Sequence, residues 1–493
     1  MVFHISDCKK YLRCPRMFYY ESQSQKSEFQ PYVRLDEEIT MLAAQKLGVT
    51  ERFKGSVGDD PSLALEAMKE YDWLIKARFE HMNLRIKVPF LHRNGEGWDL
   101  YFLHAGLFPR SDDMQFYCET VWVLRGNGID IKDYYVIHLN KDYVRRKELD
   151  TNRLFIVSDC FYNNNNRPGI LVKEAIESQI RDMRMTLLEM EGCDYDTLDP
   201  PVRTSRCSGR QKCRFYEQCF PNESVEEPNA ITTLIASQYR YAMAQDGIQR
   251  LRDAQVSLIE GTRMQYAQIR SDFLGGQFVD RLALRSWMSY IKYPITFLDF
   301  EWERYAIPPY EGMRPFDVMP FEYSIHVLEE DGTITHKVYL SVHDDRRDLA
   351  RNLINDVRPT GTVIAYNADA AEKIRIQELA EVFKEYADSL LSINERMEDL
   401  QAPFTCGAFY DTRMRGLWSL KVIMALMDDP GYKALDIQGG MDAVFQWRHL
   451  DYGDETADSQ KIIEDLKAYC GMDSYAMTVV FRWLKNLSLQ PLV

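Results

Sequence analysis

No apolar run of about 18 residues, the length needed to cross a bilayer as a helix, occurs in this sequence. The first residues, Met-Val-Phe-His-Ile-Ser-Asp, also lack the basic flank and the apolar stretch of a secretory signal. Internal repeats and low-complexity tracts are missing too. These absences argue against a membrane protein and a secreted one, and we expect a globular chain in the cytoplasm.

A surplus of positive charge is also missing, since 60 lysines and arginines face 75 aspartates and glutamates, for a net charge of −15. This balance does not exclude a nucleic-acid partner, because such proteins need only a local basic track and metal-binding carboxylates add negative charge. One short segment near residue 210 is basic. We predict that Arg206, Arg210 and Lys212 in it contact phosphate, and a merely solvated surface is the alternative.

The length of 493 residues exceeds one ordinary hydrophobic core, so we expect more than one domain. A polar segment at residues 221–229 precedes a stretch with apolar residues at helical spacing. We therefore predict a first module over residues 1–225, a helical connector over residues 226–290 and a second domain over residues 291–493.

The second domain alternates strand-like and helix-like segments. Apolar runs mark its strands, and Asp331-Gly332 is a dipeptide typical of hairpin turns. The expected strands cover residues 293–301, 321–342 as a hairpin, and 362–366, and the expected helices cover residues 345–357, 371–390 and 460–486. A meander of three strands followed by helix, strand and helix predicts an α/β domain, a mixed sheet flanked by helices.

Asp299 and Glu301 stand two residues apart at the end of the first apolar strand. Side chains two apart on a strand point to the same face, so both carboxylates can reach one site. Hydrolysis of a phosphodiester needs an activated water and stabilised oxygens, and two divalent ions about 3.5–4 Å apart, held by carboxylates, provide both. An Asp-x-Glu pair alone is weak evidence, because several occur by chance in so acidic a chain.

Tyr469 and Asp473 lie four residues apart on a predicted helix and so share one helix face. The aspartate can complete a metal site while the tyrosine hydroxyl orients the attacking water. Taken alone, the pair is more simply read as a core tyrosine and a surface carboxylate.

Together and in this order, these four residues resemble the first and third motifs of the DEDD exonucleases, in the tyrosine-containing branch of the DnaQ-like superfamily. The likeness spans about residues 290–486. Segments such as Gly312–Phe316 and Pro320–His326 are also similar to an uncharacterised bacterial family that joins a RecB-like region to such an exonuclease. The resemblance implies a ribonuclease-H-like fold and 3′→5′ exonuclease activity with two Mg²⁺ or Mn²⁺ ions.

The second motif of that superfamily departs from its usual form here. The resemblance implies an asparagine and then, after three intervening residues, an acidic residue, whereas Glu372 lies one position too late after Asn367 and Asp369 too early. We favour Glu372 as the fourth carboxylate, because the run from Glu372 to Arg375 fits the family better. Asp399 is a further candidate, although the resemblance implies that this position more often orders the fold.

Three other polar residues are candidates for supporting roles. Lys421 could reach a nucleic-acid strand and Arg314 could contact phosphate, although loop arginines are more often solvated. We predict both as nucleic-acid-binding residues. His326 lies in a predicted strand and is better explained as a hydrogen-bonded core histidine than as a catalytic base.

Ten cysteines in a cytoplasmic chain do not suggest a disulfide framework, so their spacing matters more. Cys207, Cys213 and Cys219 follow one another at six-residue intervals, and Cys14 near the start offers a fourth thiolate. Four thiolates suit a [4Fe–4S] cluster or Zn²⁺, and ordinary reduced cysteines are the alternative. The arrangement resembles the iron–sulfur RecB-family nucleases, in which a cluster joins the two ends of the domain.

The first half otherwise lacks the chemistry of that family. RecB-like nucleases cut with an aspartate on one strand and Glu-x-Lys on the next, and the matching positions here are Pro89, Phe102 and His104. None of these can hold Mg²⁺ in the required way. We therefore predict an inactive RecB-like α/β module of the restriction-endonuclease type, which could still grip DNA or a partner.

The leading hypothesis is a two-module, metal-dependent 3′→5′ exonuclease acting on single-stranded or 3′-ended DNA, with RNA as the alternative substrate. Asp299, Glu301, Asp473 and Glu372 would hold the metals, and Tyr469 would position the water. The rival is a non-catalytic nucleic-acid-binding or scaffold subunit of a repair or defence complex. The sequence names no protein partner.

Overall fold

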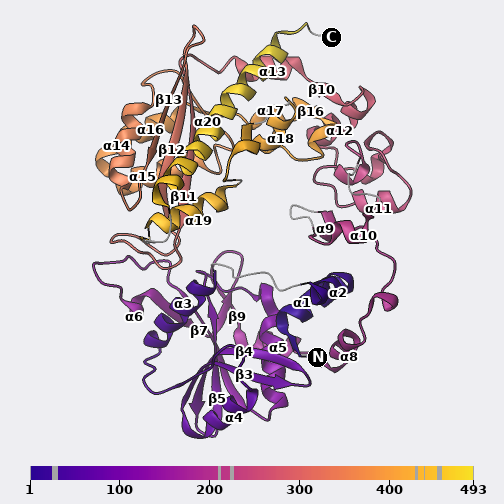
Figure 1. Cartoon of the computed structure of the whole chain (residues 1–493), viewed down its shortest axis with the longest axis vertical. Coiled ribbons are helices and arrows are strands. Elements are labelled where there is room, and N and C mark those ends of the chain that lie inside the picture. The colour runs from indigo at the N-terminus through magenta and orange to yellow at the C-terminus, as the bar shows by residue number, and fades with distance from the viewer. Residues whose placement is uncertain are drawn as a thin grey trace. The chain divides into compact units, whose positions relative to one another are not determined.

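The computed structural model describes residues 2–24, 32–208, 213–221, 227–427, 431–437, 439–451, 453 and 458–491. The chain forms an α/β protein of mixed sheets flanked by helices, as the sequence predicts (Figure 1). No helix in these ranges is both long and apolar enough to cross a membrane.

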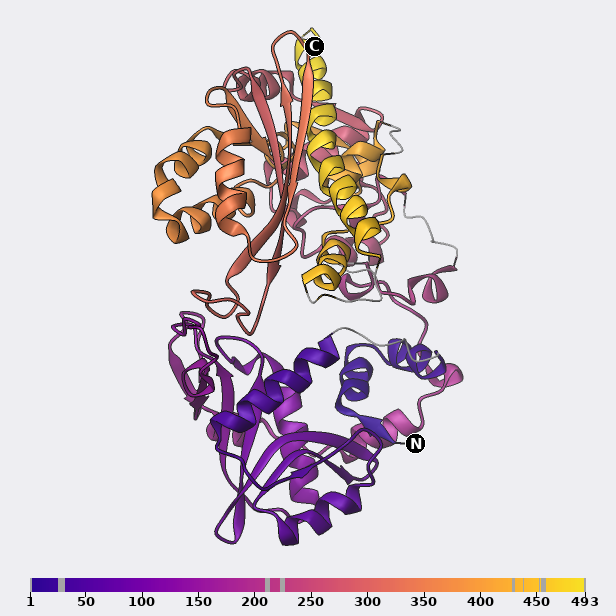
Figure 2. The same cartoon turned by 60° about the vertical axis from the view of Figure 1, so that its left-hand side comes forward.

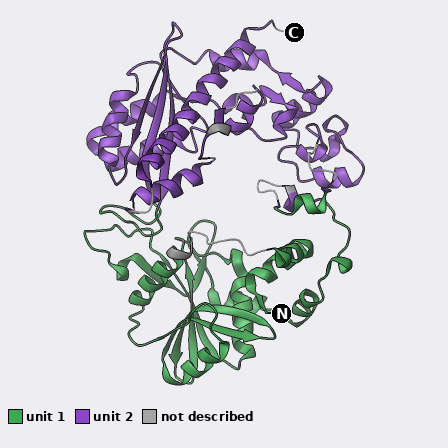
Figure 3. Ribbon diagram, in the orientation of Figure 1, with its two compact units in different colours: residues 1–202, 214–220, 305–317 green, residues 203–213, 221–304, 318–493 purple. Residues whose placement is uncertain are grey.

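The chain divides into two compact units, coloured separately in Figure 3. Unit 1 comprises residues 1–202, 214–220 and 305–317, and unit 2 comprises residues 203–213, 221–304 and 318–493. Residues 226–290 therefore belong to the same compact unit as the second domain, and residues 305–317 belong to unit 1. The division into a first module, a connector and a second domain stays a prediction.

The core of unit 1 is a seven-stranded sheet in the order β2-β3-β4-β5-β6-β7, with β1 paired to β4. The strands are β1 (Phe3–His4), β2 (Phe53–Lys54), β3 (Trp73–His81), β4 (Leu84–Asn94), β5 (Gly97–His104), β6 (Ile131–Leu139) and β7 (Phe155–Ser158). Met82, with a φ of +48°, and Asn83, with a φ of +66°, join β3 to β4. Two left-handed residues in a row give a hairpin turn whose twist matches that of the strands.

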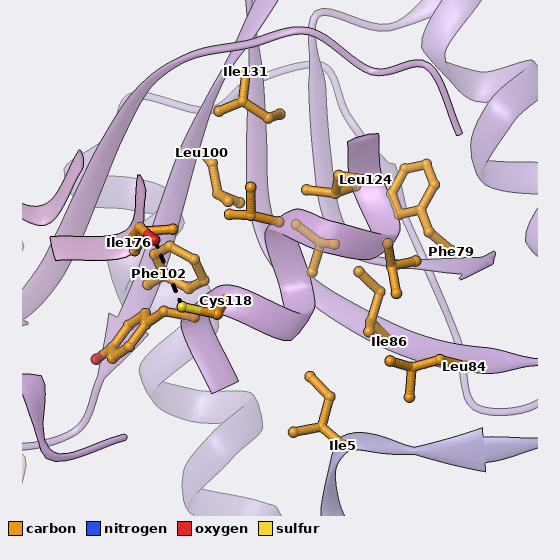
Figure 4. Packing of buried hydrophobic residues seen from close by; sticks show 14 of the residues in the cluster. Ile5, Phe79, Leu84, Ile86, Leu100, Phe102, Cys118, Leu124, Ile131 and Ile176 are labelled. Atoms are coloured by element: carbon orange, nitrogen blue, oxygen red, sulfur yellow. Dashed lines mark hydrogen bonds between the residues drawn. The ribbon is translucent and has the colours of Figure 1, made fainter. Parts of the chain in front are cut away.

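Helix α5 (Met114–Gly126) covers one face of this sheet. Figure 4 shows Phe79, Ile86 and Leu100 pointing toward Leu124 of that helix. The Cys118 thiol, also on α5, donates to the carbonyl of Ile176 across 3.8 Å. The residues of this face form a close-packed apolar core, beside which α5 also buries the carboxyl group of Glu119.

The core of unit 2 is a five-stranded sheet in the order β13-β12-β11-β14-β15. The strands are β11 (Ile295–Arg304), β12 (Val318–Leu328), β13 (Ile334–Leu340), β14 (Thr362–Ala365) and β15 (Met397–Asp399). The first three form the antiparallel meander expected from the sequence, and β14 and β15 run parallel to β11. Every residue of β12 is buried, because it lies between two strands and under helices on both faces.

Helices cover the two faces of this sheet differently. Figure 2 shows α20 (Ser459–Leu489) along one side and α14 (Arg346–Asp356), α15 (Glu372–Val382) and α16 (Ala387–Glu395) on the other. The Asp458 side chain caps α20 by accepting the Lys461 amide at 3.1 Å. Helix α20 packs against β13 at Gly471, where even a Cβ would meet the ring of His336 only at 3.4 Å, an ordinary van der Waals distance. The helices predicted at 345–357 and 460–486 are confirmed, and the one predicted at 371–390 is divided between α15 and α16.

The stretch over residues 226–290, predicted to be helical, is only partly so. It contains the short helices α11 (Arg240–Gln245), α12 (Arg263–Phe273) and α13 (Arg281–Met288), and also β10 (Gln277–Val279), which pairs with β16 (Phe409–Asp411). Buried Asp272 forms ion pairs with Arg250 at 2.7 Å and Arg252 at 2.9 Å. These contacts hold irregular backbone that apolar spacing alone does not reveal.

Candidate metal centre

The central strand β11 and helix α20 bring three of the predicted carboxylates together. Each of Asp299, Glu301 and Asp473 offers an oxygen that lies within 4.8 Å of the other two. Asp299 and Glu301 share the face of β11 that α20 covers, as their spacing of two predicts. The β11–β12 ladder shifts register directly after Glu301, and such bulges re-aim side chains beside active sites. Across the described ranges, no other three or more His, Cys, Asp or Glu side chains gather in this way.

Glu301 is buried, Asp299 and Asp473 are half-buried, and the three carboxylates repel one another. Burial raises the pKa of Asp299 well above its ordinary value, and the neighbouring charges of Asp473, Glu301 and Glu372 raise it further. Burial, followed by the charge of Asp473, does the same to Glu301. The Lys421 ammonium opposes both effects at Glu301 and Asp473, but one cation does not balance three carboxylates.

The donor set suits a hard divalent cation. All three groups offer carboxylate oxygens, which Mg²⁺ and Mn²⁺ prefer, and the group includes no sulfur or imidazole ligand. A bound cation would replace the repulsion among the carboxylates by attraction to a common centre. These residues therefore fit the metal that the sequence predicts.

Glu372, the favoured fourth carboxylate, lies beside this group. It is the first residue of α15, is 3% exposed, and its Oε2 has no hydrogen-bond partner within the described part of the chain. Burial raises its pKa to about 8, and its charge in turn raises the pKa of Asp299 and Glu301. The Glu372 oxygens are not part of the group whose ligand atoms lie within 4.8 Å of one another. Glu372 is therefore a neighbour of the three carboxylates and not a fourth member of the group.

The two other acidic candidates have different surroundings. The Asp369 side chain is 77% exposed and forms an ion pair with Lys373 at 2.6 Å. Asp399 accepts the backbone amides of Asn367 and Gln401, both at 2.8 Å. Asn367 has a φ of +60°, so Asp399 anchors a left-handed turn that leads into α15. Asp399 therefore orders the loop that carries Glu372 toward the centre.

Two tyrosines and a lysine surround Asp473. The hydroxyl of Tyr432 donates to Asp473, and the hydroxyls of Tyr432 and Tyr469 both favour its ionised form. Lys421, in α18 (Leu420–Ala425), places its ammonium 5.1 Å from the ring centre of Tyr469 and 5.0 Å from that of Tyr432. The structure thus brings the predicted residues Tyr469 and Lys421 to the centre. Tyr432 has no sequence signal, because it lies about 40 residues before Asp473 in an irregular segment.

The sequence reasoning also missed Glu322 on β12. Glu322 pairs directly with Glu301 across the strands, is 0% exposed, and neither of its oxygens has a hydrogen-bond partner in the described structure. Burial raises its pKa to about 8, and the charge of Lys467 opposes that rise. The available signal was a lone glutamate within an otherwise apolar strand.

His326 has the role predicted for it, a hydrogen-bonded core histidine. Its Nδ1 lies 2.8 Å from the Ser474 hydroxyl, which lies 2.7 Å from the Ser324 hydroxyl. Ser324 in turn lies 2.9 Å from Nε2 of His336. Burial, with a contribution from His336, lowers the pKa of His326 to about 4. This network joins α20 to the sheet next to the carboxylates and keeps the helix in register.

Of the predicted phosphate-contacting residues outside this centre, the structure describes Arg206 and Arg314. Arg210 and Lys212 lie outside the described residues. Arg206 and Arg314 are exposed, the first in unit 2 and the second in unit 1. The backbone amide of Arg314 donates to Asp317 at 2.7 Å.

The predicted cysteine ligands are divided between the units. Cys14 and Cys219 belong to unit 1, and Cys207 and Cys213 belong to unit 2. Cys14 directly precedes α2 (Pro15–Gln23), and Cys219 lies close enough to Tyr20 on that helix to add to the rise in its pKa, which burial dominates. The amide of Cys213 donates to the carbonyl of Cys207 at 2.9 Å. A four-sulfur ligand set stays a prediction.

The three positions that replace the RecB-like ligands differ in their surroundings. Phe102 is fully buried in the core of unit 1, with its ring 4.6 Å from that of Tyr117. Pro89 and Leu103 line a cavity of about 380 Å³ on the other face. Burial lowers the pKa of His104.

Comparison with known proteins gives little beyond this geometry. A family model described as a domain of unknown function, DUF2779, matches residues 296–419. The matched segment includes Asp299, Glu301 and Glu372 and ends before Asp473. No curated protein matches the chain, and no solved structure does.

Proposed function

We propose that this chain is a metal-dependent nuclease that hydrolyses phosphodiester bonds from the 3′ end of a nucleic-acid strand, with DNA as the favoured substrate. The observation that carries the proposal is the group Asp299, Glu301 and Asp473, whose oxygens lie within 4.8 Å of one another. Buried carboxylates that face one another are costly unless a ligand compensates their charge. Divalent cations held by carboxylates supply the chemistry that phosphodiester hydrolysis requires.

The residues around the centre have separate roles in this proposal. Asp299, Glu301 and Asp473 would hold the metal, and the buried Glu372 would complete the set when a second ion binds. The hydroxyl of Tyr469, next to Asp473, would orient the attacking water. Bound Mg²⁺ or Mn²⁺ stabilises charge on the attacking and leaving oxygens and lowers the pKa of a coordinated water. Lys421 is positioned beside the same centre to attract the phosphate of the strand.

The architecture of unit 2 supports its assignment to the DnaQ-like, ribonuclease-H-like exonucleases. The meander β11-β12-β13 is followed by α14, β14 and α15, the order that the resemblance implies. The two acidic residues of the first motif lie on the central strand, and the tyrosine and the aspartate of the third lie on a helix across one face. The DUF2779 match covers the strands of this sheet and is compatible with the proposal.

For the module predicted over residues 1–225 we propose an inactive RecB-like fold that Cys14, Cys207, Cys213 and Cys219 close around a [4Fe–4S] cluster or Zn²⁺. The proximity of Cys219 to the helix that follows Cys14 supports this part of the proposal. Anaerobically purified protein would be brown and contain about four irons per chain for the cluster, or colourless with one zinc. Protein without either metal would overturn it.

The test of the main proposal is degradation of single-stranded DNA and RNA, labelled at either the 3′ or the 5′ end, in the presence of Mn²⁺. The native chain is compared with Asp299→Ala and Asp473→Ala. We expect stepwise shortening from the 3′ end that both substitutions abolish. Absence of cleavage, or cleavage that is indifferent to both changes, would support the rival function of a nucleic-acid-binding scaffold.

A further inference from the structure

Unit 1 contains a basic cavity that no part of the proposed nuclease uses. Its volume is about 370 Å³, and its lining includes Arg78 on β3, Arg85 and Lys87 on β4, and His4 on β1. The loop at Val57 and Gly58, before α4 (Pro61–Glu70), also lines it. All of these residues belong to unit 1, so the cavity is separate from the carboxylate centre of unit 2. We refer to it as the Arg78 cavity.

The strand register places like charges against one another in this cavity. Arg78 is directly opposite Lys87 on the antiparallel neighbour. Burial lowers the pKa of Arg78, the charges of Asp59 and Asp36 oppose that shift, and the charge of Arg85 adds to it. Like charges directly opposite in a sheet destabilise the pairing. The backbone beside Arg78 is also strained, because Lys76 has a φ of +50° within β3. A local arrangement that costs stability is expected where function requires it.

The neighbouring acids leave Arg78 without a carboxylate partner. Glu80 binds Arg85 at 2.7 Å, and Asp36 binds Lys87 at 3.1 Å. Asp59 also lines the cavity, and its carboxylate accepts the amide of Ser56 at 2.6 Å. No acid within the described ranges comes within ion-pair distance of Arg78, whose guanidinium makes one long contact, 3.4 Å, to the carbonyl of Lys76. Most of its five donors are therefore free for a ligand.

We propose that the Arg78 cavity binds a phosphate group of a nucleotide or of a nucleic-acid strand. A guanidinium offers two parallel donors that match a phosphate, and Lys87 across the strand adds a second positive charge. The volume suits a ligand of about nucleotide size. A bound phosphate would also screen the repulsion between Arg78 and Lys87, which explains why the sheet retains that pair.

The test measures binding of a fluorescein-labelled 12-nucleotide single strand to the full-length chain by anisotropy. EDTA is present, so that the result does not depend on hydrolysis at the carboxylates. Arg78→Gln is expected to raise the Kd about tenfold, the loss of one charge-assisted, two-pronged contact. It should also lower the slope of log Kd against log salt concentration by about one. Arg78→Lys keeps the positive charge but loses the two-pronged contact of the guanidinium, so its Kd should lie between those of the native chain and Arg78→Gln.

Arg184→Gln is the matched control, because Arg184 is an exposed arginine of α8 (Arg184–Glu191) in the same unit and is paired with Asp182. It should change the Kd by less than about twofold. Adenosine monophosphate that displaces the strand from the native chain, but not from Arg78→Gln, would identify a mononucleotide site, and failure to displace it would identify a strand site. Equal Kd values for Arg78→Gln and Arg184→Gln would overturn the proposal. If Arg78→Gln does not fold, Lys87→Gln must weaken binding about threefold or the proposal fails.

Discussion

Acidic side chains next to the two sheets meet opposite electrostatic surroundings. In unit 1, the buried Lys76 ammonium on β3 donates to Asp36 at 2.9 Å and to Glu37 at 2.7 Å, both on helix α3 (Tyr32–Lys46). On the sheet of unit 2, Asp299 and Glu301 face Asp473 and raise one another's pKa. In unit 1 Lys76 balances these two ionised acids, whereas the carboxylates of unit 2 are left to be balanced by something that binds. This difference in charge balance, more than the fold, is why we propose a metal site in unit 2.

The largest expected effect concerns the fourth carboxylate. Glu372→Gln should lower the rate of Mn²⁺-dependent cleavage about a hundredfold or more, since it removes a charge that helps to hold the metals. Asp369→Asn is the matched control and should stay within about twofold, because Asp369 is exposed and already paired with Lys373. Initial rates on a 3′-labelled strand compare the two variants. If both variants lost the same fraction of the cleavage rate, Glu372 would be the wrong choice for the acidic residue of the second motif.

The next effect is the pH dependence of stability that the unpaired acid Glu322 produces. Burial raises the pKa of Glu322 to about 8, so the folded chain keeps a proton that the unfolded chain releases above pH 4.5. Stability is therefore lost as pH rises from about 4.5 to 8. Glu322→Gln removes this loss, and we expect it to stabilise the chain by about 3 kcal/mol more at pH 8 than at pH 5.

Thermal melting of the metal-free chain at the two pH values measures this difference for Glu322→Gln. Glu464→Gln, an exposed glutamate on the same helix that covers Glu322, is the control and should show no such change. A variant less stable than the native chain at pH 8 would mean that Glu322 is ionised and engaged, contrary to its surroundings in this structure.

The two tyrosines beside Asp473 should have distinct effects on the reaction. Tyr469→Phe should lower kcat about thirtyfold without changing the Mn²⁺ concentration needed for half-maximal rate, since its proposed role is to orient water. Tyr432→Phe should mainly raise that Mn²⁺ concentration, because Tyr432 donates to a metal-binding carboxylate. Mn²⁺ titrations of both variants give the two parameters. Identical profiles would remove the assigned division of roles.

The sequence predicts those parts of the site that have a local pattern. Asp299 with Glu301 follows strand periodicity, and Tyr469 with Asp473 follows helix periodicity, so spacing alone places each pair on one face. Glu322 and Tyr432 reach the centre only through strand pairing and an irregular loop, which a single sequence does not specify. The antiparallel meander of the second sheet was similarly accessible, because its apolar runs are long and its turn is marked by Asp331-Gly332, whereas β15 was not predicted.

The first sheet is harder to predict for a related reason. Its charged residues lie on strands whose pairing decides which charges meet, as with Arg78 opposite Lys87. Register is a tertiary property, and a slip of one residue would turn every one of these side chains to the other face. The short segment at residues 305–317 illustrates the same limit, since its Ala306 and Ile307 join the apolar cluster around Ile39 of unit 1.

The smallest expected effect concerns Asp36 and Glu37, which are paired with lysines. Their contribution to stability should depend on pH in the opposite direction to that of Glu322. Burial alone would raise the pKa of Asp36, but hydrogen bonds from Lys76 and Lys87 outweigh it and lower the pKa. Hydrogen bonds from Lys54 and Lys76 lower the pKa of Glu37. The resulting stability is present above the ordinary carboxyl pKa and is lost as pH falls through the lower folded value. Both carboxylates are more than a third exposed, so solvent screening reduces the effect.

Lys76→Met should therefore destabilise unit 1 by about 1 kcal/mol at pH 7 and by less at pH 3.5, measured by thermal melting. Lys69→Met is the control, because Lys69 forms only an exposed pair with Glu66. Replacing a paired lysine thus costs most at high pH, whereas replacing the unpaired Glu322 helps most at high pH. If both replacements changed stability with the same pH dependence, the two sheets would not differ in charge balance, and the electrostatic basis for placing the metal in unit 2 would be lost.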